Sequence, residues 1–261
     1  MSLSHPVRSA LSSIFVFSIA LPGFLLSQSA EPSKDEIIQR AWTAMFGSAK
    51  SEEIRSLYVE SFFHGSATPS RQTVKRPNLF RNEVSSGVLV FDGKRAAWVE
   101  RKPDENGKPL GPEVLDQAHW RHFEVDIALL LPAFFDYPSE YMGKEAVEGG
   151  DAYKLRVTLP LGGKVIYFVD AGSFLVKKRL VSWDGGSPAA YWENTMTGHR
   201  QYDGILFPEG CTYPGRDGRE TGTYRNVRIN VNPADGLFKI PDELVEPPLA
   251  KPTPGGSRLL P

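Results

Sequence analysis

The stretch Val74–Phe80, VKRPNLF, joins two runs that have the residue pattern of β-strands, Gln72–Arg76 and Leu79–Val84. Proline fixes φ and lacks a backbone donor, and asparagine tolerates the left-handed region, so Pro77-Asn78 predicts a turn at which the chain reverses. Two cations precede the turn and an aromatic ring follows it. Charge and apolar bulk are therefore expected close together at one end of a hairpin.

The chain around this hairpin has turn residues between short runs, as all-β proteins do. Its 24 glycines and 21 prolines fall largely between short runs rich in Val, Ile, Phe, Tyr and Thr. Asp92-Gly93-Lys94 predicts a second hairpin. From Glu148-Gly149 onward, further turns follow at fairly even spacing, which is typical of an antiparallel meander of about 10–11 strands. The fold class is therefore mainly β.

Two segments are expected to be helical. Ser33 and Glu36 have the spacing of a capping box, and apolar residues then recur at helical intervals until Gly47. The segment Glu113–Phe134 lacks β-branched alternation and carries an apolar cluster that ends at Pro132, so it predicts one or two short helices. Lying between hairpins, these helices are candidates for a lid over one face of the sheet.

The N-terminus has the layout of a secretory signal peptide over residues 1–29. Arg8 precedes an apolar stretch, Leu11–Leu26, and small residues follow it, so cleavage is expected near Ser29-Ala30. An uncleaved membrane anchor is the alternative, but the run is shorter than the ~20 residues that a spanning helix needs. Export of a processed chain is the favoured interpretation.

The remaining chain predicts one domain over residues 30–245 and a Pro-rich, disordered tail over 246–261. Lys and Arg number 30 against 31 Asp and Glu, so no positive excess exists to neutralise a nucleic-acid backbone. Nucleic acid is not expected as a partner. The single cysteine, Cys211, has no internal disulfide partner and is expected to be buried.

Catalytic and metal-binding patterns are weak. His119 and His122 lie three residues apart near Glu124 and Asp126, but no H-E-x-x-H pattern or G-x-S-x-G elbow accompanies them. An enzyme that uses His119, His122 or Asp126 stays open as a minor hypothesis. We expect no catalytic residue, no metal and no cofactor.

A sheet with apolar residues on more than one face, covered by helices, can hold a greasy ligand, because each buried CH₂ contributes about 0.8 kcal/mol. Ordinary core packing is the alternative for each aromatic residue. The candidates for the wall of such a cavity are Trp42, Tyr58, Phe62, Tyr153 and Phe168, with Phe80 and Trp98 nearer the hairpin ends.

VKRPNLF resembles the equivalent segment of LolA-like periplasmic carriers of outer-membrane lipoproteins. The similarity extends to Asp92-Gly93-Lys94 with Trp98 after it, and loosely to Gly204–Pro208 and Phe238. The resemblance implies a curved, incomplete antiparallel barrel capped by helices. It implies a monomer that binds the acyl chains of a lipoprotein or lipid in the periplasm, without chemistry.

The resemblance also implies roles for particular residues. Arg76, before the proline, would hold the lid through hydrogen bonds, and Phe80 would handle cargo at the mouth, with Trp98 nearby. A solvated strand-end cation is the alternative for Arg76. An inner-membrane release complex and an outer-membrane receptor are the implied partners. The long loop Lys102–Pro112 and the tail depart from the compact carriers, so a lipid-sensing module docking on a membrane partner remains the alternative function.

Overall fold

The structure is a computed structural model that describes residues 31–63, 66–147, 149–182, 192–215 and 218–244. The expected signal peptide at residues 1–29 and the expected tail at 246–261 lie outside these residues. Among the described helices, none is long and apolar enough to cross a membrane.

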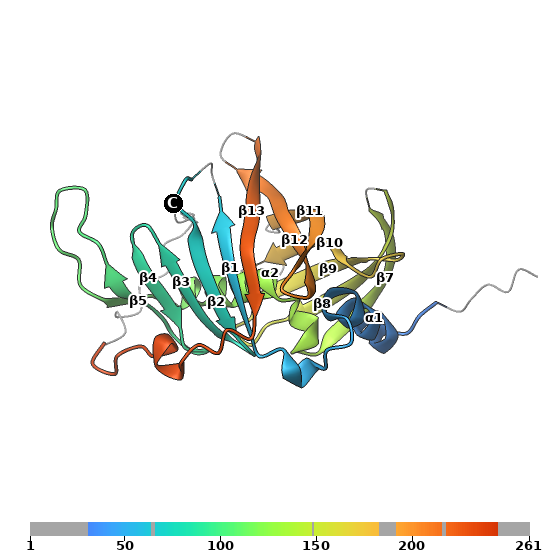
Figure 1. Cartoon of the computed structure of the whole chain (residues 1–261), viewed down its shortest axis with the longest axis horizontal. Helices are drawn as coiled ribbons and strands as arrows, with labels where there is room; N and C mark the ends of the chain where they lie inside the picture. The colour runs from blue at the N-terminus through green and yellow to red at the C-terminus, as the bar shows by residue number, and fades with distance from the viewer. Residues whose placement is uncertain (1–30, 64–65, 148, 183–191, 216–217, 245–261) are drawn as a thin grey trace, which may run out of the picture. The chain divides into compact units, whose positions relative to one another are not determined.

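Thirteen strands form one antiparallel sheet (Figure 1) in the order β6-β5-β4-β3-β2-β1-β13-β12-β11-β10-β9-β8-β7. The sheet is not closed, because β6 and β7 form its two edges. The strands are β1 Ser56–Phe62, β2 Ser70–Lys75, β3 Leu79–Val84, β4 Gly87–Phe91, β5 Ala96–Arg101, β6 Glu113–Val114, β7 Ser139–Val147, β8 Gly150–Thr158, β9 Lys164–Asp170, β10 Val176–Ser182, β11 Trp192–Tyr202, β12 Ile205–Gly215 and β13 Gly218–Ile229.

Two α-helices and three short 3₁₀ helices accompany the described part of the sheet. Helix α1 begins after Ser33, whose side chain and Glu36 form the predicted capping box, and it ends at Gly47 with φ +64°. Their bounds are α1 Lys34–Phe46, α2 Gln117–Leu130, η1 Ser51–Glu53, η2 Ala133–Phe135 and η4 Asp235–Phe238.

Both α-helices pack on one face of the sheet, which we call the covered face. Helix α2 contacts both β5 and β9, so it crosses the sheet, and in Figure 1 it runs behind β1, β2 and β13. Helix α1 contacts β12 and η2. We call the opposite face the outer face. The short helix η4 packs against β3. The predicted lid position of the helical segment is thus confirmed in its geometry.

Side-chain alternation sorts the strands between these faces. Leu57 and Val59 on β1 are buried in the same cluster as residues of α1 and α2, and Val74 and Phe80 lie beside them in register. A second cluster on the covered face surrounds Tyr167 on β9. One sheet face and the helices therefore enclose an apolar interior that is made of two clusters.

The expected fold class is confirmed, and so are both predicted hairpins. The VKRPNLF turn joins β2 to β3 through a cis Arg76–Pro77 peptide, and Asp92 closes the second turn by accepting hydrogen bonds from the N–H groups of Lys94 and Arg95. The sheet has more strands than the 10–11 expected. One reason is β6, which is only two residues long and carries no alternation that a sequence pattern could reveal.

Candidate functional site: the lid contacts and the covered face

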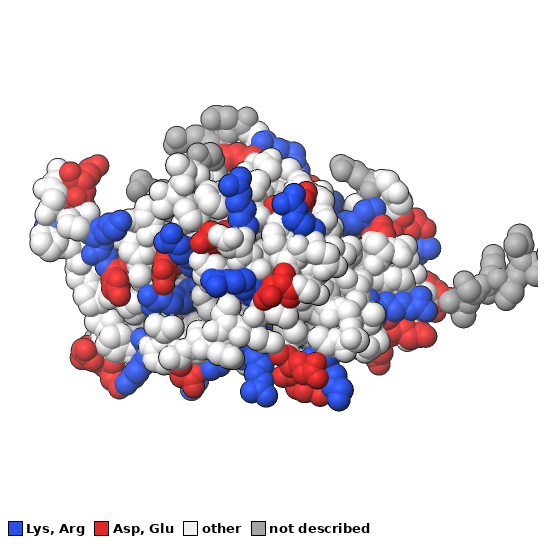
Figure 2. Space-filling model, viewed as in Figure 1, with Lys and Arg blue, Asp and Glu red and all other residues white. Residues whose placement is uncertain are grey.

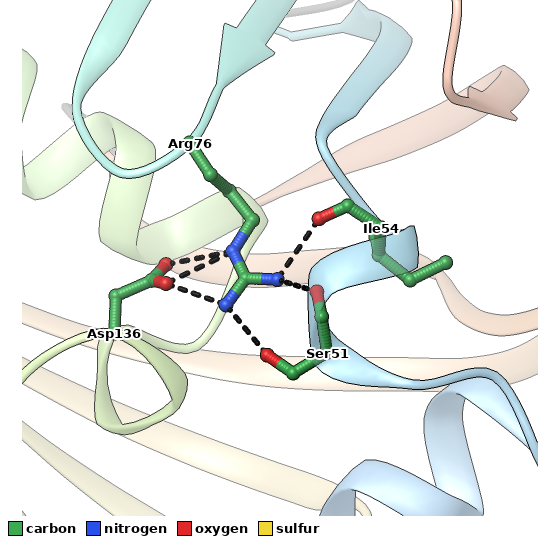
Figure 3. A network of polar contacts seen from close by, with 4 residues as sticks. All are labelled: Ser51, Ile54, Arg76 and Asp136. Carbon is green, nitrogen blue, oxygen red and sulfur yellow. Dashed lines mark hydrogen bonds and ion pairs between the residues drawn. The ribbon is translucent and has the colours of Figure 1, made fainter.

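Arg76 lies at the centre of a polar network that joins three separate segments (Figure 3). Its Nε donates to both carboxylate oxygens of Asp136, at 2.9 and 3.1 Å, and Nη2 donates to Oδ1 at 2.5 Å. Nη1 donates to the carbonyls of Ser51 and Ile54 at 2.7 and 2.9 Å, and Nη2 also donates to Ser51 Oγ at 3.1 Å. All three nitrogens of the planar guanidinium group thus donate hydrogen bonds.

These contacts connect the β2–β3 hairpin to the helical layer. Ser51 and Ile54 belong to the segment that follows α1. Asp136 directly follows η2, which comes after α2 in the chain. The guanidinium carbon also lies 5.4 Å from the ring centroid of Trp42 on α1. Arg76 and Asp136 each have side chains only 12% exposed, so the ion pair is shielded from solvent. Arg76 is therefore placed where it can fasten the helices to the sheet.

Phe80 lies beneath α2 and is fully buried. Its ring centroid is 6.0 Å from that of Phe123 on α2, and Phe123 in turn stacks at 6.5 Å on Phe91 of β4. The structure thus places Phe80 under the lid helix and not at an exposed mouth. Any contact with cargo would require α2 to move.

Two of the candidate wall residues lie between the helices and the covered face. Trp42 projects from α1, where its Nε1 donates to the carbonyl of Ala49, and it packs edge-on against Phe135 at 4.9 Å. Tyr153 on β8 is buried in the cluster around Tyr167. These aromatic rings form part of the interior between helices and sheet.

Three other candidates lie on the outer face and do not line this interior. Tyr58 and Phe62 alternate with Leu57 and Val59 along β1, and Phe168 alternates with Tyr167 along β9. Cations cover each of these rings. The contacts are Arg228 over Tyr58 at 4.6 Å, Arg225 over Phe62 at 5.0 Å, and Lys178 and Lys154 over Phe168 at 5.1 and 5.6 Å.

Trp98 is half-buried on β5, next to the edge strand β6. It pairs with Leu89 and packs against the apolar cluster of the covered face, while the guanidinium carbon of Arg101 lies 6.0 Å from its ring centroid. Trp98 is thus far along the sheet from the Arg76 network, and the structure does not bring the two together.

A narrow apolar cleft opens on the covered face between α1, the end of α2, and strands β10–β12. Its volume is ≈ 30 Å³, which is room for about two water molecules. The apolar lining includes Met45 of α1, Leu130 of α2, Phe135 of η2 and Met196 of β11, and the polar residues that line it are Arg179 and His199. Burial lowers the pKa of His199. Helices α1 and α2 therefore pack closely against the sheet.

Tyr167 fixes the junction between α2 and η2. Its hydroxyl donates to the carbonyl of Ala128 at 2.9 Å and accepts from the N–H of Ala133 at 2.8 Å. Burial raises the pKa of Tyr167, so this hydroxyl stays protonated and can donate. The end of α2 is thus attached to strand β9 of the sheet.

Glu124 is an acidic group within the lid helix. It is 3% exposed, and both its oxygens accept from the N–H of Leu161 at 3.2 and 3.0 Å. Burial raises its pKa to about 7, against the smaller opposing effects of that hydrogen bond and of Arg121. Its charge therefore changes near neutral pH.

The outer face carries a separate, open hollow of ≈ 900 Å³ around β1, β12 and β13. Glu60 and Arg228 contribute opposite charges to its lining. In the view of Figure 2, basic and acidic side chains are interspersed and do not gather by sign. This surface offers no single-sign field for a charged polymer.

Asp116 and His119 at the start of α2 are explained by helix capping. The Asp116 carboxylate accepts from the N–H of His119 at 3.0 Å and lies 2.7 Å from its Nδ1. Among the described residues, no group of three His, Cys, Asp or Glu side chains could hold a metal ion. His119, one member of the histidine pair singled out in the sequence, thus has a structural role at the helix start.

Sequence reasoning missed Asp136, Tyr167 and Arg179 as parts of the covered face. Asp136 lies 60 residues from Arg76 along the chain, and no local pattern connects the two. Tyr167 and Arg179 each sit in an ordinary strand pattern. Their places follow only from the register of β9 and β10 beneath the helices.

No family model and no curated protein matches the sequence significantly. Solved structures do match. A LolA superfamily protein of Nitrosomonas europaea is 15% identical, with a TM-score of 0.51 over 80% of this chain and 99% of that one. A putative outer membrane lipoprotein-sorting protein domain of Vibrio parahaemolyticus is 14% identical, with a TM-score of 0.43 over 78% and 94%. With its open antiparallel sheet and its covering helices, the chain has a LolA-like fold.

Proposed function

We propose that this chain is a non-enzymatic binding protein that holds the acyl chains of a lipoprotein or lipid between the covered face and helices α1 and α2. The observation that carries the proposal is the apolar interior shared by the helices and one sheet face, closed by the polar contacts of Arg76. The LolA-like fold supports it. We place its action in the periplasm, as a monomer that moves cargo toward the outer membrane.

Binding requires the helices to separate from the sheet. The cleft beside α1 is too small for an acyl chain, so cargo would replace packing contacts that α1 and α2 now make. Apolar contacts with the cargo would offset the loss, since each transferred CH₂ contributes about 0.8 kcal/mol. Arg76 would then set how readily the lid opens.

The proposal is tested by expression in a bacterial periplasm, purification without detergent, and mass spectrometry of extracted lipids. We expect acyl-containing lipid in amounts comparable to the protein, and saturable binding of a fluorescent fatty-acid probe to the delipidated chain. Neither bound lipid nor probe binding would overturn the proposal.

Transfer is tested separately. Loaded protein is mixed with acceptor vesicles or with a candidate outer-membrane receptor, and the lipid that leaves the protein is measured. Release to the acceptor supports the carrier role. Tight binding without release, together with capture of an inner-membrane regulatory partner, would instead favour a lipid-sensing module.

A further inference from the structure

Arg179 is a buried cation on the covered face without a carboxylate partner among the described residues. It is 3% exposed, it lies on β10 beneath the helices, and it lines the apolar cleft. Its Nη1 donates to the carbonyl of Leu129 near the end of α2, and its Nη2 lies 3.2 Å from Met196 Sδ. A charge in such surroundings is costly unless an anion compensates it.

One nitrogen of this guanidinium has no hydrogen-bond partner. Arg179 Nε is buried and has no hydrogen-bond partner. Asn194 lies opposite Arg179 on the neighbouring strand β11. This residue is 4% exposed, and its Nδ2 also has no hydrogen-bond partner. Directly opposite side chains in an antiparallel pair have Cβ atoms only ~5 Å apart. Two residues with buried, unsatisfied donors thus lie opposite each other on neighbouring strands.

We propose that Arg179, which lines the apolar cleft, and Asn194 beside it on β11 bind the carboxylate of a long-chain fatty acid whose hydrocarbon chain occupies that cleft, enlarged by movement of the helices. A carboxylate supplies the acceptors that these two groups lack, and it neutralises the buried charge. The cleft lining is otherwise mainly apolar, which matches a hydrocarbon chain. The inference rests on the acyl-binding role proposed above and specifies the ligand class.

The same contact links the ligand to the lid. The Leu129 carbonyl belongs to the last turn of α2, where carbonyl groups lack partners within the helix. An arriving carboxylate would compete with that carbonyl for the Arg179 guanidinium. Occupation of the site would therefore loosen the end of α2.

The test compares palmitate with its uncharged methyl ester, each at concentrations where it is monomeric, by displacement of an uncharged fluorescent acyl probe from the delipidated chain. We expect palmitate to bind roughly tenfold to hundredfold more tightly than the ester. Arg179→Met should remove this preference and leave binding of the ester unchanged. Arg156→Met, which removes an arginine on β8 paired with Glu140, should preserve the preference.

A purely structural role for Arg179 predicts different results. If Arg179 only holds the end of α2, Arg179→Met would lower the melting temperature and weaken acid and ester alike. The proposal predicts weaker binding of palmitate alone, with binding of the ester unchanged, whatever the change in melting temperature.

Other outcomes are equally decisive. If Arg179→Met does not fold, Asn194→Leu and the acid–ester comparison in the unaltered chain still apply, and Asn194→Leu should reduce the preference. Equal binding of acid and ester would overturn the inference but leave the acyl-binding role intact. Binding of neither would overturn the acyl-binding role itself. Tighter binding of lysophosphatidic acid than of palmitate, with the same dependence on Arg179, would overturn the assignment to a fatty acid.

Discussion

Replacing Arg76 by leucine should release the lid while the sheet stays folded. The guanidinium makes six contacts within hydrogen-bond distance, three of them to Asp136. Removing one partner of a buried ion pair costs about 3–5 kcal/mol, because the remaining charge is left without a partner. Since both side chains retain 12% exposure, we take the lower end, about 3 kcal/mol.

This cost appears in the opening of the lid, because the contacts join the lid to the sheet. With 1.4 kcal/mol for each factor of ten, the open population should rise about a hundredfold. Amide hydrogen exchange measures this open population. The amides of Phe135 and Asp136, which donate to the carbonyls of Pro132 and Ala133, should exchange about a hundredfold faster. Amides of strand β13, at the centre of the sheet, should keep their protection.

Arg156→Leu is the matched control, because it removes an arginine–glutamate pair on the exposed β7–β8 edge and should leave lid exchange unchanged. Asp136→Asn, which keeps the size and some acceptors, should give a smaller increase than Arg76→Leu. Unchanged exchange of Phe135 and Asp136 in a folded Arg76→Leu protein would refute the reasoning.

Further predictions concern the packing and charge of the lid. Phe80→Ala should lower the free energy of unfolding by about 3–5 kcal/mol in chemical denaturation, because a fully buried ring under α2 is lost; a cost below 1 kcal/mol would show that the site is not packed. Tyr167→Phe should cost about 1–3 kcal/mol by the same measurement, because the N–H of Ala133 and the carbonyl of Ala128 lose their partner. Glu124→Gln should flatten the pH dependence of stability. The folded pKa of Glu124, about 7, exceeds its unfolded value of 4.5, so its contribution is full below pH 4.5 and is lost as the pH rises to 7. Over that range the wild type should lose up to about 3 kcal/mol relative to Glu124→Gln, and parallel pH profiles of melting temperature would contradict this.

Local patterns in the sequence were sufficient for the framework of the fold. The capping box at Ser33, the VKRPNLF turn and the Asp92-Gly93-Lys94 turn each depend on residues within a few positions, so their chemistry is readable in the sequence. The predicted placement of Arg76 at a hairpin end beside helices agrees with the contacts that the structure shows. Its role in lid opening stays a prediction.

The assignment of side chains to faces could not be made from local patterns. Tyr58 and Phe168 have the same aromatic character as Tyr153, but they stand on the outer face under cations. Alternation says which residues share a face of one strand, and only the register of all strands and the position of the helices say which face is covered. For the same reason Arg179, in an ordinary strand pattern, gave no sign of its burial.

The most direct measurement is photocrosslinking of a fatty acid that carries a diazirine at the end of its acyl chain, followed by mass spectrometry of the labelled peptides. We predict labels on the covered face and its helices, at residues such as Met45 and Met196, and competition by unlabelled palmitate. Labels confined to the outer face around Tyr58 and Phe168, or no saturable labelling, would contradict the proposed binding of lipid beneath the helices.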